Sequence, residues 1–226
     1  MVFSPEWERR YVENTHASVW PWSDLVSCAM RHSAAKLAAG ANTRVLEIGC
    51  GAGANVPFFQ KFGVSYCGID GSEAVIARLR SRFTAWQDRF FVADFTTTMP
   101  VQGPFDIIVD RSSMTHNTEQ DIRRGLGLIH QEMMPGGVYY GIGWFSVQCS
   151  EFTRGHPAED DWTRMGYHDG PFFDTGKVHF SDKMHLLDLF QDFEILSLQH
   201  SLVMTEIPVS EEKLAYWNIV ARKRSS

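Results

Sequence analysis

The sequence has few cysteines and none of the spacings that would give them a special role. Its 226 residues include four cysteines, Cys28, Cys50, Cys67 and Cys149. They lie far apart and form no CxxC pair or Cys/His ligand pattern. A disulfide framework is therefore not expected, and neither is a metal site. Cysteine usage of this kind is typical of a reduced, cytoplasmic protein.

Clustered positive charge and long apolar runs are also scarce. The net charge is −6, and the basic run Arg222-Lys223-Arg224 lies at the chain end. This balance argues against a nucleic-acid partner, which would need grouped lysines and arginines. No window has the ~20 apolar residues of a membrane span, and the polar start has no apolar signal-peptide core. We expect a cytoplasmic protein without a membrane or nucleic-acid partner; monomer and homodimer both stay open.

The remaining composition suits one packed domain. Hydrophobic residues make up 44% and aromatic residues 13%, and no repeat or low-complexity linker divides the chain. Strand and helix patterns alternate, which predicts an α/β fold with a mostly parallel sheet. The expected parts are a helical N-terminal cap (1–42), a core (43–145), an insertion (146–180) and a C-terminal helix with two strands (181–226).

Seven strands and several helix starts can be placed. The strands are predicted at residues 43–48, 64–69, 89–93, 105–109, 138–145, 193–204 and 213–222. Only a short link containing Pro208 separates the last two, so they should pair antiparallel. The predicted N-caps are Ser23, Ser72, Thr118 and Ser181.

A glycine-rich segment follows the first predicted strand. Residues 47–53 read EIGCGAG, and glycines at a strand-to-helix turn let a ligand approach the backbone and the helix N-terminus. Gly49, Gly51 and Ala54 also satisfy the dinucleotide pattern G-x-G-x-x-G/A, and Asp70 ends the next strand. Taken alone, the loop therefore also allows a nicotinamide-dependent oxidoreductase.

Four features in order favour a different family. Glu47 stands two residues before the GCGAG loop, Asp70 closes strand two, Asp94 closes strand three, and MPGG at residues 134–137 precedes strand five. In these respects the chain resembles the class I S-adenosylmethionine-dependent methyltransferases of the bacterial small-molecule type, over residues 43–145 and more loosely in the last two strands. The resemblance implies an enzyme that uses S-adenosylmethionine. It also implies a doubly wound, Rossmann-like sheet of seven strands whose last strand is antiparallel.

The resemblance also implies roles for individual residues. The loop glycines would pack on the methionine portion of the cofactor, and Glu47 would orient the loop and its ammonium side. Asp70 would accept hydrogen bonds from the ribose hydroxyls, since a charged acceptor makes the stronger bond. Asp94 would accept from the adenine amino group. The predicted cofactor site is Glu47, Gly49, Gly51, Gly53, Asp70, Gly71, Ser72, Asp94, Phe95, Asp110 and Trp22.

Two of the predicted site segments allow a second interpretation. Trp22 would form a wall over the cofactor or simply pack where its helix begins. Residues 110–116, DRSSMTH, lie where the family has acceptor-side residues. There His116 is the candidate general base, positioned by Asp110 and Arg111; alternatively, it is a loop histidine bonded to backbone. A base should give activity that rises with pH through a pKa near neutrality. His179 is a second candidate.

The insertion at 146–180 combines aromatic residues with acidic ones such as Glu159, Asp160 and Asp161. It resembles a lid on the acceptor side, and its acidity disfavours polyanionic substrates. We therefore expect a small-molecule acceptor. The resemblance to bacterial small-molecule methyltransferases implies methylation of a hydroxyl on a sugar or natural-product intermediate, with an amine or a carboxylate as alternatives. A protein that binds S-adenosylmethionine without catalysis is the other hypothesis besides the oxidoreductase.

Overall fold

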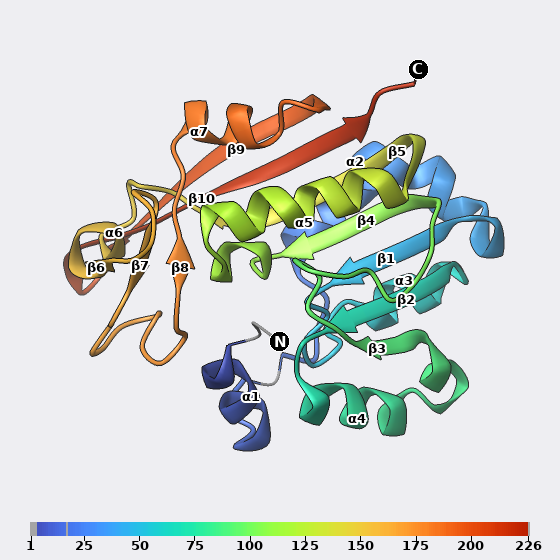
Figure 1. The fold of residues 1–226 in the computed structure, drawn as a ribbon, viewed down its shortest axis with the longest axis horizontal. Helices are drawn as coiled ribbons and strands as arrows, with labels where there is room; N and C mark the ends of the chain where they lie inside the picture. Colours follow the sequence, from blue (N-terminus) through green and yellow to red (C-terminus); the bar gives the residue numbers. More distant parts are fainter. Residues whose placement is uncertain (1–3, 17, 226) are drawn as a thin grey trace.

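The fold is built on one seven-stranded sheet with helices on both faces (Figure 1). The computed structural model describes residues 4–16 and 18–225. The strand order is β3-β2-β1-β4-β5-β10-β9. These strands are β1 (Arg44–Ile48), β2 (Ser65–Asp70), β3 (Phe90–Val92), β4 (Phe105–Arg111), β5 (Met133–Phe145), β9 (Phe193–Glu206) and β10 (Val209–Lys223).

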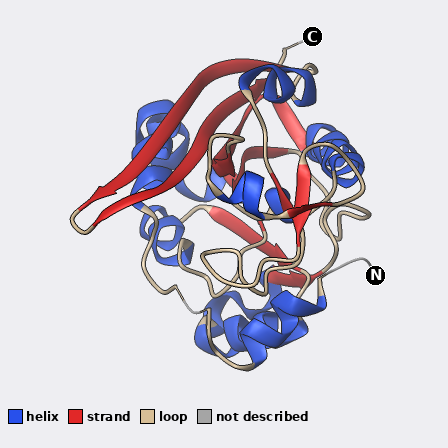
Figure 2. Cartoon of the chain, turned by 90° about the vertical axis from the view of Figure 1, so that its left-hand side faces the viewer, coloured by secondary structure: helices blue, strands red, loops and turns tan. Residues whose placement is uncertain are grey.

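Strand directions confirm the predicted topology. The first five strands run parallel, and β10 lies between β5 and β9, antiparallel to both. A further parallel strand in place of this terminal pair would have favoured the oxidoreductase. In the view of Figure 2 the β9–β10 hairpin extends well beyond the rest of the sheet.

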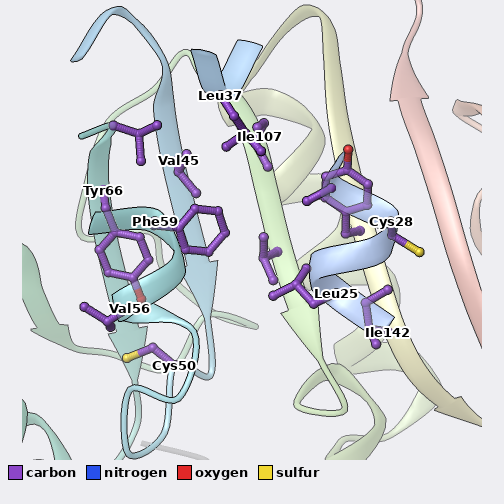
Figure 3. Close-up of a cluster of buried hydrophobic side chains, with 14 of the residues drawn as sticks. Leu25, Cys28, Leu37, Val45, Cys50, Val56, Phe59, Tyr66, Ile107 and Ile142 are labelled. Carbon is purple, nitrogen blue, oxygen red and sulfur yellow. The ribbon is translucent and has the colours of Figure 1, made fainter. Parts of the chain in front are cut away.

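Each face of the sheet carries its own hydrophobic cluster. The helices are α1 (Pro5–Val12), α2 (Ser23–Ala38), α3 (Val56–Phe62), α4 (Glu73–Arg82), α5 (Glu119–Glu132), α6 (Glu151–Arg154) and α7 (Lys183–Leu189). On one face α2, α3 and α4 pack on the central strands, and Figure 3 shows Leu25 and Phe59 among these buried side chains. On the other face α5 and α7 bury residues such as Ile122 and Leu186. Burial on both faces explains the apolar runs within the central strands, such as residues 107–109 of β4.

Local sequence placed two helix starts correctly and two wrongly. The hydroxyls of Ser72 and Thr118 accept hydrogen bonds from the amides of Val75 and Asp121, as predicted. Ser181 does not cap α7; Asp182 does, because its carboxylate accepts from the His185 amide. The residue before α2 is Trp22, so Ser23 is the first helical residue rather than its cap. Asn55 accepts a hydrogen bond from the Trp22 amide, which holds the chain extended at this point.

The N-terminal segment and the insertion have more structure than predicted. Residues 1–3 and 17 of the expected cap lie outside the described residues; the remainder forms α1 and α2. Within 146–180, α6 precedes a small antiparallel sheet of β6 (His156–Pro157), β7 (Thr163–Met165) and β8 (Val178–His179). In Figure 1 this sheet lies toward the ends to which the parallel arrows point, and α1 lies beside α4. Among the described residues, no helix is both long and apolar enough to cross a membrane.

Candidate active site

A cavity of about 620 Å³ lies at the carboxyl ends of the parallel strands. Its lining comes from the glycine loop, the ends of β2, β3 and β4, helix α1, the start of α2 and the insertion. This is where open α/β sheets bind their ligands, because the loops after neighbouring parallel strands diverge there. Of the predicted residues, it is lined by Glu47, Gly49, Gly51, Asp70, Gly71, Asp94, Phe95, Trp22, Arg111 and His116.

The glycine loop can approach its neighbours closely only because Gly49 and Gly51 have no side chains. Gly49 and Gly51 have φ values of +58° and +50°, the left-handed region that L side chains avoid. A Cβ on Gly49 would stand 2.2 Å from the Cβ of Ser113, and one on Gly51 would stand 2.9 Å from the Tyr11 hydroxyl. Gly51 is thus covered by helix α1, and Gly49 by the loop after β4.

Replacing Gly49 by alanine should destabilise the protein by at least about 2 kcal/mol, since left-handed strain adds to overpacking against Ser113. Chemical denaturation measures this loss. The matched control is Gly127→Ala in α5, where a Cβ would meet nothing within 4 Å. That change should stabilise the helix by about 0.5–1 kcal/mol. Equal effects at the two positions would contradict the close packing of the loop.

Glu47 ties the loop to its surroundings. Its two carboxylate oxygens accept hydrogen bonds from the Asn55 amide nitrogen and the Tyr66 hydroxyl, both at 2.7 Å. Asn55 in turn accepts from the Trp22 backbone amide at 3.1 Å. Burial raises the pKa of Glu47 to about 7, although these two bonds oppose the shift. Glu47 therefore joins β1, the start of α3 and the start of α2 at one edge of the cavity.

Asp70 closes β2 and lies 4% exposed in the cavity wall. One oxygen accepts from the Gly51 amide at 2.9 Å and the other from the Ser72 amide at 3.0 Å. Each oxygen has a further lone pair, so the carboxylate can also accept from two hydroxyls. Burial is the main cause that raises the pKa of Asp70 to about 6, against the pull of these amides.

The affinity for S-adenosylhomocysteine should consequently fall with pH below about 6. Ribose hydroxyls bond best to the ionised Asp70 carboxylate, so once the group is protonated in the unliganded protein, binding must expel that proton. The loss should approach tenfold per pH unit, measured by calorimetry between pH 7.5 and pH 5. Asparagine does not titrate, so in Asp70→Asn the fall in affinity below about pH 6 should vanish. If the fall persists in that variant, the pH dependence belongs to another group.

Asp94 at the end of β3 keeps an unused acceptor. Its Oδ1 accepts from the amide and hydroxyl of Thr96, at 3.0 and 2.6 Å. Its Oδ2 is buried and has no partner among the described residues. A buried carboxylate oxygen without a donor is costly, and the amino group of an adenine would satisfy it. With Phe95 beside it in the wall, this donor set fits the expected cofactor.

Three predicted cofactor residues, Gly53, Ser72 and Asp110, are not among the residues that line the cavity. Asp110 is fully buried, and its oxygens accept from Ser113, Met114, Tyr139 and Trp144. It therefore holds the loop after β4 rather than contacting a ligand or positioning an acceptor. A Cβ added to Gly53 would stand 2.5 Å from a methyl carbon of Leu79 in α4. The Ser72 hydroxyl is already occupied, because it accepts the capping hydrogen bond from the Val75 amide.

His116 lines the cavity and is also bonded to backbone, so both interpretations apply. Its Nδ1 lies 3.0 Å from the carbonyl oxygen of Lys177. A carbonyl only accepts, so Nδ1 carries the proton and Nε2 the lone pair. Burial lowers the pKa of His116 to about 4, which corrects the expectation of titration near neutrality. His179 lies outside the lining; it is fully buried, with Nε2 3.1 Å from Nε2 of His185.

Helix α1 is the part of the site that sequence reasoning missed. Trp7, Arg10, Tyr11 and His16 from this segment line the cavity. The helix docks on α4 through a hydrogen bond from the Ala74 amide to Glu8, and on the insertion through an ion pair of Arg9 with Asp174. Pro5 at its start, acidic residues in its first turn and arginines in its last were the available signal.

Arg111 and Trp22 form a stacked pair in the cavity wall, with the guanidinium carbon 3.5 Å from the ring centroid. Burial lowers the pKa of Arg111, and the nearby Asp24 and Asp110 carboxylates partly oppose this. Trp22 also packs on the core, as one of its two interpretations predicted, while its position in the lining leaves the cofactor contact as a prediction. A cation held on an aromatic face beside the glycine loop suits the carboxylate of an amino-acid group.

Comparison with solved structures agrees with this geometry. A search of curated sequences finds no match. A methyltransferase from Methanosarcina mazei is 18% identical with a TM-score of 0.65, covering 81% of this chain and 93% of that one. The 1,6-didemethyltoxoflavin N1-methyltransferase of Burkholderia thailandensis, bound to S-adenosylhomocysteine, is 21% identical with a TM-score of 0.57, covering 87% of this chain and 78% of that one. The glycopeptide N-methyltransferase MtfA, bound to sinefungin, is 16% identical with a TM-score of 0.61, covering 92% of this chain and 87% of that one.

At these identities the solved structures establish the fold. The reaction class comes from the sequence, because residues 45–137 match the family model of a methyltransferase domain. That range runs from β1 to the start of β5, so it includes the glycine loop, Asp70 and Asp94. Over residues 45–137 the chain is therefore similar to a methyltransferase domain, on a fold that it shares with solved S-adenosylmethionine-dependent methyltransferases.

Proposed function

We propose that this methyltransferase acts on a hydroxyl group of a small molecule and that His116 is the general base. The observation that carries the proposal is the continuity of one cavity from Asp70 and Asp94 to His116. S-adenosylmethionine, when bound, would supply a methyl group on its sulfonium; the acceptor oxygen would bond to that methyl carbon in line as the S–CH3 bond breaks and neutral S-adenosylhomocysteine leaves. Holding the two reactants in register is worth roughly 7–11 kcal/mol of the barrier.

The cofactor would be held by groups that the described residues leave available. Asp70 would accept from the ribose hydroxyls, and the unpartnered Oδ2 of Asp94 from the adenine amino group. Arg111 and the backbone at Gly49 would face the methionine end, with Glu47 supporting the loop from behind. Tyr11, which lies over Gly51, would close this side against water.

His116 would take the acceptor proton at Nε2. The Lys177 carbonyl fixes the tautomer that leaves this nitrogen as the acceptor. With a pKa of about 4 it is a weak base, and it is neutral throughout the physiological range. A weak base suffices because a hydroxyl oxygen becomes strongly acidic as it gains the methyl group. The depressed pKa then lets the imidazolium return its proton to water.

Walls of aromatic rings support an acceptor of small size. Trp7 packs edge-on against His116, with ring centroids 4.8 Å apart, and Phe145 contacts Phe172 at 4.6 Å. Helix α1 and the insertion both line the cavity and are joined there by the hydrogen bond from Arg10 to Phe173, which favours a small acceptor over a macromolecular chain. An amine acceptor is the alternative, favoured by the two neighbours that are N-methyltransferases.

Transfer from S-adenosylmethionine with a labelled methyl group tests the proposal. The acceptor panel should pair each hydroxyl compound with its O-methyl ether and with the corresponding amine. Label is expected only on compounds that have a hydroxyl available. Label on the amines but not on the alcohols would replace the proposed acceptor. If S-adenosylhomocysteine binds and no member of the panel is labelled, a binding protein without catalysis is the better description.

A further inference from the structure

Two arginines face the cavity without an anionic partner. Arg10 on α1 and Arg111 at the end of β4 both line it, and the Nε of each is buried without a hydrogen-bond partner. Among residues 4–16 and 18–225, neither forms an ion pair with a carboxylate. Burying an unsatisfied guanidinium N–H is costly, so each position is expected to receive an acceptor atom from a ligand.

The two arginines come from different elements of the cavity wall, and, in addition to burial, the charges of both lower the pKa of His16 between them. Arg111 stacks on Trp22, whose amide reaches Glu47 and the glycine loop through Asn55. Arg10 lies on α1, where its Nη1 donates to the Phe173 carbonyl oxygen of the insertion at 2.8 Å. The amino-acid end of S-adenosylmethionine brings a single carboxylate, for which Arg111 is sufficient. The charge of Arg10 is then left for the second ligand, the acceptor.

The surroundings of Arg10 favour an anion there. Acidic side chains in the described lining are Asp24, Glu47, Asp70 and Asp94, which lie beside Arg111 or at the cofactor residues. Titratable neighbours of Arg10 include Tyr11, His16 and His116. Burial raises the pKa of Tyr11. Burial also lowers the pKa of both histidines, reinforced by the charge of Arg10 and, for His16, of Arg111, so none of the three neutralises Arg10 near pH 7.

Resting on the proposed function, we propose that Arg10 binds a carboxylate of the methyl acceptor, and that the substrates are small aromatic hydroxycarboxylic acids. The planar guanidinium fork matches a carboxylate with two parallel hydrogen bonds. Trp7, on which Arg10 lies at 5.5 Å, and the rings of Phe145 and Phe172 provide apolar walls for an aromatic body. The hydroxyl would face His116, and the acidic insertion disfavours more than one negative charge.

Matched acid and amide pairs test this with the protein saturated by S-adenosylhomocysteine. The probes are the 2-, 3- and 4-hydroxybenzoates and the corresponding hydroxybenzamides, titrated by calorimetry. At least one acid should bind about tenfold or more tightly than its amide, the size expected for a hydrogen bond between charged groups. Arg10→Met should abolish this preference and leave the affinity for S-adenosylhomocysteine unchanged.

The neighbouring Arg9 supplies a control on the same helix. Arg9 is exposed and also fastens α1 to the insertion, through Asp174, so Arg9→Met should loosen the helix without losing the carboxylate preference. Arg10→Lys keeps the charge and should retain part of the preference, which guards against a misfolded methionine variant. Thermal unfolding without ligand should be similar for the two Arg10 variants and wild type, and no higher for Arg9→Met.

Each contrary outcome has a distinct meaning. If wild-type protein does not bind S-adenosylhomocysteine, the proposed function fails, and the inference with it. If it binds the cofactor product but no acid is preferred over its amide, only the inference is overturned. The inference is also wrong if Arg10→Met weakens S-adenosylhomocysteine and spares the acid preference, because Arg10 would then serve the cofactor.

Discussion

The kcat of the His116→Ala enzyme is expected to be about 10²–10⁴-fold lower than that of wild type, which is the usual contribution of a positioned general base. Its affinity for S-adenosylhomocysteine should be unchanged, because His116 lies at the Lys177 and Trp7 side of the cavity. The loss should shrink as the acceptor hydroxyl becomes more acidic, since such an acceptor needs less help in losing its proton. Steady-state kinetics with a series of phenols of graded acidity measures this.

The pH profile adds a second readout for His116. The base works in its neutral form, and its pKa is lowered to about 4 by burial. The wild-type kcat should therefore stay level from about pH 8 to pH 6 and decline only as the pH approaches 4. An acid limb near pH 6.5 would point to another base. A variant effect confined to the KM of the acceptor would make His116 a binding residue.

The Asp70→Ala variant is expected to bind S-adenosylhomocysteine about a hundredfold or more weakly. Two hydroxyl hydrogen bonds to a charged acceptor would be lost, each worth about 1.5–3 kcal/mol. The variant also removes the acceptor of the Gly51 and Ser72 amides, so its unfolding without ligand must be followed separately. Asp70→Asn keeps one acceptor oxygen, so its affinity for S-adenosylhomocysteine should lie between those of Asp70→Ala and wild type. Affinity within twofold of wild type in Asp70→Ala would refute the ribose assignment.

Features that depend on adjacent residues were predictable from the sequence. The caps at Ser72 and Thr118 need only a hydroxyl three residues before a helix amide. Asp70 and Asp94 could be brought together because parallel neighbouring strands end at one edge of a sheet, and β2 and β3 are such neighbours. The same applies to the terminal hairpin, whose short link permits little besides antiparallel pairing.

Features that depend on which way a side chain turns were not predictable. β4 is buried on both faces, so its apolar pattern does not say whether Asp110 or Arg111 faces the cavity. In the structure Asp110 accepts hydrogen bonds from Tyr139 and Trp144 in the core on the α5 side, and Arg111 lines the cavity. The pKa of His116 likewise depends on burial by α1 and the insertion, segments far from it in the sequence.

Calorimetric titration with S-adenosylhomocysteine and, separately, with NADH tests the central claim most directly. The wild-type protein should bind S-adenosylhomocysteine with 1:1 stoichiometry and should show no heat with NADH. At a ligand concentration a hundred times Kd, its stability should rise by about 2.7 kcal/mol. Binding of NADH without binding of S-adenosylhomocysteine would contradict the assignment of Asp70, Asp94 and the glycine loop to a methyl donor.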